Sequence, residues 1–397
     1  MTATHDSPLK YRDRFPILAS TNYLISNSLG AMPSEVRQSL NEYAETWASR
    51  GVRAWEEGWW TLAAGLGNLV APLLGAKPAE VVFQPCVTIA HAIMFSCFDF
   101  AKRNRIVTDA MHFPSILYLI EGLKGQGATV EAVPSDDGIT IDAGRLIDAI
   151  DSTTAFVNIS HVLFKSAFIQ DVKSIAAKAR EVGAITIIDG YQSVGTIPVD
   201  VTELGVDVYI GGCLKWLCGG PGAAFLWVRP ELRERLTPKI TGWMAHAKPF
   251  AFETEMEYRT DAWRYLLGTP SIPSLYAAQP GLKIINEAGI NAIRAKSTHQ
   301  TSLLMELAQS HGFSVTSPSN PERRGGTVAI SMEHGLEISR ALKTQEILCD
   351  FRPGAGVRLS PHLYTRDEEL REAIEAISQI IEDRSWQQYA TRDSVVT

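Results

Sequence analysis

The middle of the chain alternates short apolar runs with helical patterns, and this alternation constrains the fold more than any other feature. Runs rich in Val and Ile, each bounded by Gly, Asp, Pro or Ser, predict strands at 79–83, 105–109, 128–134, 154–160, 184–190, 206–212 and 225–228. Residues 171–184 carry apolar side chains on one helical face and basic ones on the other, with Gly183 as a stop signal. This order predicts an α/β fold with a mostly parallel central sheet covered on both faces.

The last third of the chain has a different pattern. Residues 282–312 predict one or two helices, and GGTVAISM (325–332) and GVRLS (356–360) predict strands. Thr365 opens a last helix, and Glu368 three residues later completes a predicted capping box. We expect a large domain over 36–285, a small α+β C-terminal domain over 286–397, and an N-terminal segment, 1–35, that joins the small domain.

Composition narrows the functional classes. The 397 residues are 45% hydrophobic and 20% charged, as in ordinary globular proteins, and the net charge of -7 argues against a nucleic-acid partner. No run of 18 apolar residues predicts a membrane span, and the polar N-terminus lacks the apolar core of a secretory signal. The five scattered cysteines form no CxxC pair, which disfavours a metal site or a disulfide framework. We therefore expect a cytoplasmic protein without a bound metal.

Two residues at predicted strand ends carry the first indication of chemistry. Asp189 ends one strand, and Lys215 follows the next strand within a cluster of glycines: Gly211, Gly212, Gly219, Gly220 and Gly222. Ligands of open α/β sheets bind beyond the carboxyl ends of strands, and glycines let the backbone approach a ligand closely. A lysine in an apolar pocket can form a Schiff base, and an aspartate on a pyridine nitrogen makes pyridoxal phosphate (PLP) an electron sink. Each residue alone is commonly structural, but together they indicate a PLP site.

The chain also resembles a known family along nearly its whole length. The order of its motifs is similar to that of kynureninases, which are fold type I PLP enzymes of the aminotransferase class V group. The similar segments are YLISNSLGAMP (23–33), MHFPS (111–115), SHVLFKSA (160–167), GGCLKWLCGGPG (211–222), GWMAH (242–246), YLLGTPSI (265–272) and CDFRPGAGVRLSPHLY (349–364).

The resemblance implies a set of site residues. Lys215 would hold PLP covalently and move the Cα proton, and Asp189 would pair with the pyridine nitrogen. The other implied cofactor contacts are Gln192 on the phenolic oxygen, Phe113 stacked on the ring, and Thr88 and Ile89 on the phosphate at a helix start. Trp243 and Thr269 would come from the second subunit of a homodimer, and Arg358 would bind the α-carboxylate of an amino-acid substrate.

Each of these residues also has a structural interpretation. Phe113 and Trp243 could be packing aromatics, Thr88 a helix cap and Arg358 a surface charge. His161 is a weaker site candidate, and the short interval between Cys349 and Arg358 favours a structural Cys349 over a sulfur carrier. The tryptophans of RAWEEGWW, Trp55, Trp59 and Trp60, could line an aromatic pocket, although packing is the commoner role.

The resemblance implies hydrolytic cleavage of a Cβ–Cγ bond through a quinonoid intermediate. Several positions depart from the kynureninase pattern, however. Leu214 replaces a tyrosine before the lysine, Leu163 replaces an asparagine, and Phe164 replaces a second tyrosine. Gln192 stands where kynureninases usually carry histidine and cysteine desulfurases carry glutamine. We therefore predict a kynureninase-like C–C bond lyase, and these departures indicate a shifted substrate or a shifted reaction.

Two other classes of function stay open at this point. The first is a different PLP reaction of class V: a transaminase, a cysteine desulfurase or lyase, an epimerase, or a decarboxylating C–C bond-forming enzyme. The second is an inactive PLP-fold protein that serves as a binding module, which the presence of both Lys215 and Asp189 disfavours.

Overall fold

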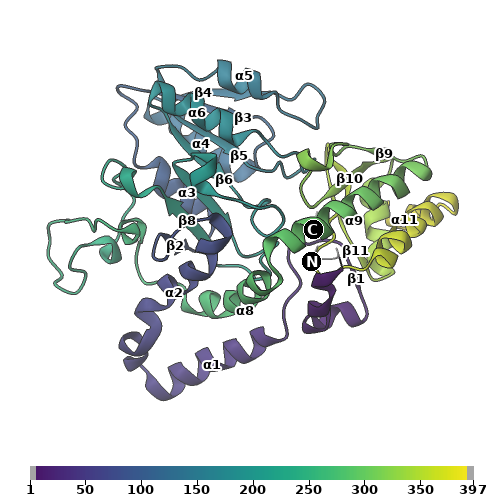
Figure 1. The fold of residues 1–397 in the computed structure, drawn as a ribbon, viewed down its shortest axis with the longest axis horizontal. Coiled ribbons are helices and arrows are strands. Elements are labelled where there is room, and N and C mark those ends of the chain that lie inside the picture. Colours follow the sequence, from purple (N-terminus) through teal and green to yellow (C-terminus); the bar gives the residue numbers. More distant parts are fainter. Residues whose placement is uncertain (1–5, 391–397) are drawn as a thin grey trace.

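A seven-stranded sheet forms the centre of the computed structural model, which describes residues 6–390 (Figure 1). Its strands are β2 (Val81–Gln84), β3 (Arg105–Asp109), β4 (Thr129–Val133), β5 (Thr154–Ser160), β6 (Ile185–Asp189), β7 (Val208–Gly212) and β8 (Ala224–Val228). They lie in the order β2-β8-β7-β6-β5-β3-β4, and β8 runs antiparallel to both of its neighbours. The pairs from β7 through β4 are parallel, so the predicted mostly parallel α/β sheet is confirmed.

Helices cover both faces of this sheet, because alternate side chains of each strand point to opposite sides. Phe156 of β5 packs in one hydrophobic core with α3 (Val87–Phe95) and α4 (Pro114–Leu123). Its neighbour Val157 packs in a second core with α2 (Trp60–Val70), α6 (Val172–Val182) and α8 (Ile272–Ala288). Asp171 caps α6 by accepting the Ser174 N–H, and Gly183 ends the helix in the left-handed conformation, as the sequence predicts.

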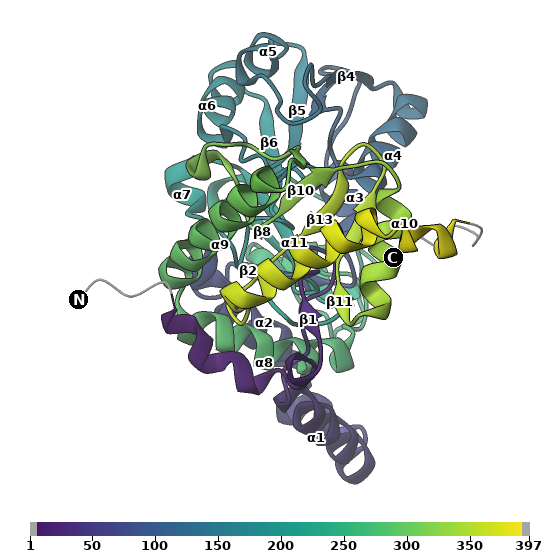
Figure 2. The same ribbon diagram turned by 90° about the vertical axis from the view of Figure 1, so that its right-hand side faces the viewer.

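A smaller antiparallel sheet with its own core lies to the right of the first in Figure 1 and in front of it in Figure 2. Its order is β12 (Asp350–Arg352), β13 (Gly356–Leu359), β10 (Val328–Ser331) and β9 (Ser314–Val315). The helices α9 (Ile290–Ser310), α10 (Gly335–Thr344) and α11 (Asp367–Glu382) contribute to that core. The region 282–312, predicted as one or two helices, lies on two, α8 and α9, which meet at Gly289.

The N-terminal segment lies against the C-terminal part of the chain. The short strand β1 (Asn22–Tyr23) pairs in parallel with β11 (Ile347–Leu348). Arg12 forms a buried two-pronged ion pair with Glu369 of α11, with both N–O distances at 2.8 Å. The remaining helices are α1 (Glu35–Arg50), which packs on α8, and the short α5 (Ala143–Asp148) and α7 (Val201–Leu204).

The predicted capping box at Thr365 and Glu368 is wrong by one residue. The helix α11 begins at Asp367, and the Glu369 carboxylate accepts the backbone N–H of Arg366 at 2.7 Å. The Thr365 hydroxyl instead accepts the His362 N–H at 2.9 Å. The capping box forms one residue later than predicted because Glu369, which accepts the Arg366 N–H, is also held by Arg12. This contact joins the two ends of the chain, so local sequence does not reveal it.

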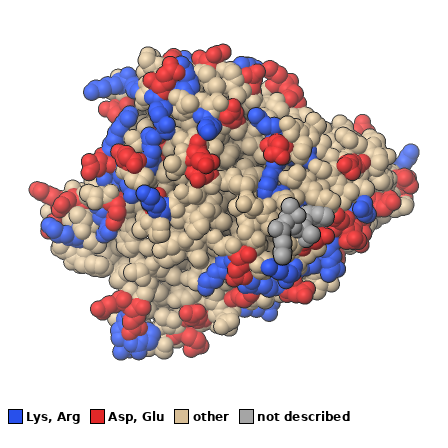
Figure 3. All heavy atoms as spheres, viewed as in Figure 1, with Lys and Arg blue, Asp and Glu red and all other residues tan. Residues whose placement is uncertain are grey.

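The visible surface carries both signs of charge in an interspersed pattern, without a broad basic face (Figure 3). None of the helices within residues 6–390 has the length and apolar character that a membrane crossing requires.

Candidate active site

Asp189 and Lys215 meet at the carboxyl ends of two adjacent parallel strands. Asp189 is the last residue of β6 and pairs in register with Ile210 of β7, and Lys215 lies in the loop that follows β7. Lys215 is 9% exposed, and its Nζ atom lies 4.2 Å from the centre of the Tyr191 ring and 5.7 Å from that of the Phe113 ring. The sheet thus brings the two predicted residues of the PLP site together.

The surroundings of Lys215 favour its neutral form. Burial lowers the pKa of Lys215 to about 7, and the nearby Asp189 carboxylate opposes this shift while Arg358 adds to it. A protonated ammonium has no lone pair, so a lowered pKa increases the share of nucleophilic amine at neutral pH. This is the form of lysine that reacts with an aldehyde such as that of PLP.

The Asp189 carboxylate is buried, and it is held by a hydrogen bond from the loop that follows it. One of its oxygens, Oδ1, accepts the backbone N–H of Tyr191 at 2.8 Å. The ring nitrogens of His91 and His112 approach it, so that one ligand-type atom from each of the three residues lies within 4.8 Å of the others. The Nε2 atoms of both histidines have no hydrogen-bond partner in the described part of the chain. Such a group could hold a metal, so the expectation of no metal stays a prediction.

The start of α3 provides a site for an anion. Cys86 is the N-cap residue, and the first hydrogen bond within the helix runs from the Ala90 N–H to the Cys86 carbonyl at 3.1 Å. Among residues 6–390, the N–H groups of Val87, Thr88 and Ile89 have no backbone or side-chain acceptor. Unpaired N–H groups at a helix N-terminus attract phosphate, as predicted for Thr88 and Ile89.

Phe113 precedes α4 and faces the lysine. Its side chain is 43% exposed, so it belongs to none of the hydrophobic cores, and the interpretation as a core residue is wrong. Its ring contacts Phe164 edge to face, with centroids 5.3 Å apart. An exposed ring beside Lys215 suits a planar cofactor better than it suits core packing.

Gln192 lies close to the site, but its amide already has partners. Its Oε1 atom accepts the indole N–H of Trp216 at 2.8 Å, and its Nε2 atom donates to the Asn27 carbonyl at 3.0 Å. One N–H of the amide is left over for a ligand. The predicted contact between Gln192 and the cofactor's phenolic oxygen therefore has a single donor available.

Arg358 of β13 comes from the smaller sheet, and it is 2% exposed, so the interpretation as a surface charge is wrong. Its Nε and one terminal nitrogen donate to Asp350 at 2.8 and 2.5 Å, and the other terminal nitrogen donates to the Phe164 carbonyl. A guanidinium has five N–H groups, so two are left to bind a carboxylate. Arg352 shares the Asp350 carboxylate at 3.2 Å.

Trp243 and Thr269 lie in the segment between β8 and α8. The Trp243 ring meets Trp60 and Phe250 edge to face, with centroids 5.5 and 5.7 Å apart. Thr269 is exposed and lines a hollow with Gln84, Pro85 and Gly222. Their predicted role in the site of a second subunit stays a prediction.

The tryptophans of the 53–60 segment pack mainly against other rings. Trp55 stacks on Trp60 at 4.3 Å, and Trp59 stacks on Tyr43 at 5.5 Å. His161 is buried, and its Nδ1 atom lies 2.8 Å from the Tyr209 hydroxyl. Cys349 is buried, and burial raises the pKa of its thiol, which suits the structural role inferred from the sequence.

Three further residues of the site were not found from the sequence. Tyr191 lies beside Lys215, and Asp350 holds Arg358. Asp109 ends β3 with no exposed surface, and burial raises the pKa of its carboxyl to about 7. Tyr191 lies in the same DGYQ stretch as Asp189, and Asp350 lies in the CDFR stretch, so their positions beside nominated residues were the available signal.

Comparisons with known proteins agree with this geometry. The family described as aminotransferase class-V matches residues 22–356. Kynureninase of Pseudomonas fluorescens is 32% identical over 98% of this chain and 97% of its own length. Kynureninase of Bacillus anthracis is also 32% identical, over 99% of this chain and 96% of its own length.

Solved structures show the same fold at lower identity. The cysteine desulfurase of Thermococcus onnurineus NA1 has a TM-score of 0.83 at 20% identity, covering 94% of this chain and 98% of its own. The enzyme C-DES, solved with glycine covalently linked to its PLP cofactor, has a TM-score of 0.85 at 19% identity, covering 92% of this chain and 98% of its own. The neutral amine of Lys215, the carboxylate of Asp189 and the free N–H groups of α3 fit the aldehyde, pyridine nitrogen and phosphate of PLP. The chain belongs to the aminotransferase class-V family, with the fold type I architecture and the PLP cofactor that its sequence indicates.

Proposed function

We propose that this chain hydrolyses the Cβ–Cγ bond of an amino acid that carries a γ-carbonyl group, as a kynureninase does, on a substrate other than kynurenine. In the overall reaction, the water oxygen bonds to Cγ and a proton is delivered to Cβ, so that a carboxylic acid and alanine leave. The observation that carries the proposal is the buried Lys215, which lies between two aromatic rings and beside Asp189 and Arg358 in a chain 32% identical to kynureninases.

Each residue has a role that its surroundings support. PLP, when bound, withdraws electrons from the substrate Cα. Lys215, with its lowered pKa, can accept and return a proton at Nζ near neutral pH. The two remaining N–H groups of Arg358 can grip the substrate α-carboxylate, and Asp350 fixes the orientation of the guanidinium. Phe113 offers an exposed ring face for a planar group.

The departures from the kynureninase pattern support a different substrate. Leu163 is buried and cannot hydrogen-bond through its side chain, and Phe164 lies at the edge of Phe113 without a hydroxyl. A kynurenine-like polar substituent would therefore find no side-chain hydrogen-bond partner at either of these two positions, which costs binding. A substrate with a less polar side chain beyond the γ-carbonyl suits these residues better.

The structure supports the other reactions of class V to different degrees. A desulfurase reaction with Cys349 as sulfur carrier is disfavoured, because this thiol is buried and its pKa is raised. A transaminase, an epimerase or a decarboxylating C–C bond-forming enzyme would use the same Lys215 and Arg358. An inactive binding module would not need a lysine with a pKa near 7.

The experiment that tests the proposal is a screen of γ-keto amino acids with the PLP-loaded protein. We expect alanine release without any added keto acid, at a higher kcat/KM for a substrate other than kynurenine. Strict dependence on a keto acid would instead establish transamination, and inversion of configuration at Cα without bond cleavage would establish an epimerase.

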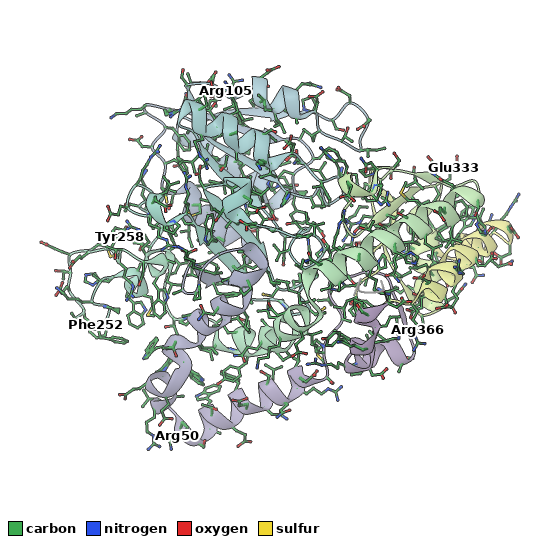
Figure 4. All side chains as sticks on the ribbon, viewed as in Figure 1. Arg50, Arg105, Phe252, Tyr258, Glu333 and Arg366 are labelled. Atoms are coloured by element: carbon green, nitrogen blue, oxygen red, sulfur yellow. The ribbon has the colours of Figure 1, made fainter. Side chains whose placement is uncertain are left out.

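We further propose a homodimer in which Trp243 and Thr269 complete the site of the neighbouring subunit. Thr269 is exposed, and the Trp243 cluster includes Phe252, which is 77% exposed and lies on an outlying loop (Figure 4). Exposed apolar groups of this kind favour a protein contact. Sedimentation should give twice the chain mass, and a monomer that binds PLP with full affinity would exclude the shared site. The free thiols of all five cysteines suit the reducing cytoplasm that we propose as the location.

A further inference from the structure

One position near Lys215 lacks a group that kynureninases have. Leu214 precedes the lysine where the family pattern has a tyrosine, whose hydroxyl serves the cofactor phosphate. The aliphatic Leu214 side chain cannot donate a hydrogen bond, so beside the free N–H groups of α3 the phosphate loses this hydroxyl donor unless another residue supplies one. The structure offers such a residue on the neighbouring strand end.

Tyr191 is that residue. Its ring lies against Lys215, with the ring centre 4.2 Å from Nζ, and its backbone N–H binds the Asp189 carboxylate at 2.8 Å. Both anchors of the predicted cofactor therefore touch Tyr191, one through its ring and one through its backbone. A side chain held at both ends in this way has a defined orientation relative to a ligand between Asp189 and Lys215.

The hydroxyl end of Tyr191 extends toward the helix that would hold the phosphate. A Cβ atom added at Gly212 would lie 2.6 Å from the Tyr191 ring and 3.2 Å from its hydroxyl oxygen, so the phenol runs across the end of β7. Tyr191 also packs against the hydrophobic core that contains Val87 and Ala90 of α3. These contacts place the phenol at the end of β7, on the face of the sheet that α3 covers.

The Tyr191 hydroxyl is available to a ligand. Within residues 6–390 it makes no hydrogen bond, although Tyr191 is only partly exposed. Burial raises the pKa of the Tyr191 phenol, and the nearby Cys213 thiol and Asp189 carboxylate act in the same direction. The group therefore stays protonated and acts as a hydrogen-bond donor near neutral pH.

We propose that Tyr191 is a cofactor ligand whose hydroxyl donates a hydrogen bond to the PLP phosphate and so replaces the tyrosine that is absent at position 214. The chain would then have moved a phosphate-binding hydroxyl from the strand end of β7 to that of β6. This inference concerns PLP binding alone, and it does not depend on the reaction proposed above.

The test compares the dissociation constants of PLP and of pyridoxal, which lacks the phosphate, by titrating the protein stripped of cofactor. Tyr191→Phe keeps the ring against Lys215 and removes the hydroxyl alone. A hydrogen bond to a charged group corresponds to a change of roughly 10- to 100-fold in binding. We expect PLP affinity to fall by about this factor and pyridoxal affinity to stay within about twofold.

A second variant tests the replacement directly. Adding Leu214→Tyr to Tyr191→Phe should restore most of the lost PLP affinity, because it returns a hydroxyl to the position of the family pattern. Tyr118→Phe is the matched control, since Tyr118 is 74% exposed on α4, and it should leave both affinities unchanged. Equal weakening of PLP and pyridoxal by Tyr191→Phe, or unchanged PLP affinity, would overturn the proposal.

Discussion

Two buried cations converge on the site, one from each sheet, and the protein treats them differently. Lys215 from the large sheet forms no ion pair with any carboxylate in the described part of the chain, and burial lowers its pKa to about 7. Arg358 from the small sheet is bound on two nitrogens by Asp350, which has no exposed side-chain surface. Both are buried, yet one is shifted toward its neutral form and the other stays paired.

The difference follows from the chemistry of the two side chains. Transfer of a charge into a buried site costs free energy, and this cost is met either by loss of the proton or by an opposite charge. A lysine can lose its proton, which makes it a nucleophile, whereas an arginine cannot and needs a carboxylate. The site therefore obtains a reactive amine and a permanent cation from similar degrees of burial.

The first prediction removes the reactive member of this comparison. Lys215→Ala should abolish covalent attachment of PLP completely, because Nζ is the only atom that this position offers to the aldehyde. Borohydride reduction followed by mass spectrometry should find the cofactor on a Lys215 peptide in the unmodified protein and on no peptide of the variant. Lys165→Ala is the control, because Lys165 lies beside Phe164 and should keep the label on Lys215. If the reduced cofactor is found on a Lys165 peptide of the unmodified protein, the assignment of Lys215 is refuted.

The second prediction removes the partner of the other cation. Asp350→Ala leaves the Arg358 guanidinium buried with half of its partners, and unfolding free energy should fall by about 3–5 kcal/mol, as for other buried pairs. Asp136→Ala breaks an exposed pair with Arg145 and should cost about 0–1 kcal/mol. Denaturant titration of both variants measures the difference.

The pairing explanation has its own check. Asp350→Ala combined with Arg358→Met removes both charges, and it should recover most of the stability that the single variant loses. If the double variant is as unstable as Asp350→Ala alone, Asp350 stabilises the fold through something other than its ion pair.

The smallest effect that we predict is a pH dependence. The neutral form of Lys215 decreases about tenfold per pH unit well below its pKa, so attachment of PLP to the stripped protein should slow by roughly 50-fold between pH 7 and pH 5. The rate should level off above about pH 7 because the pKa is lowered to about 7. A free lysine derivative, whose amine titrates near pH 10.4, should keep accelerating to high pH. A protein rate that follows the free amine would show that the lowered pKa is wrong.

Much of the large sheet was predictable from the sequence. The predicted strands 105–109 and 154–160 coincide with β3 and β5, because buried parallel strands appear as short runs of Val and Ile bounded by polar residues. The antiparallel direction of β8 was not predicted, since direction depends on how the chain returns to the sheet. The strands β9, β11 and β12 were missed because two or three residues contain no usable periodicity.

The site divides in the same way. Lys215 and Asp189 were predictable, because both follow strands whose ends meet at one edge of the sheet. The pairing of Gln192 with Asn27 and Trp216 was not, since Asn27 lies far away in the sequence and arrives through the N-terminal segment. Tyr191 was missed because its value depends on the direction of its ring, which sequence spacing does not give.

The pairing of the N-terminal segment with the end of the chain has a consequence for synthesis. Gly30 donates its N–H to the Leu214 carbonyl at 2.9 Å. The strand β1 can pair only after β11 has been synthesised, and Arg12 can pair only after Glu369 has been synthesised. Contacts between distant parts of a chain form late, and domains generally fold in the order in which the ribosome releases them. A nascent chain that has not yet exposed residue 369 therefore lacks the support beneath its lysine loop. We therefore expect a chain that ends before residue 369 to capture the cofactor less well than the full chain.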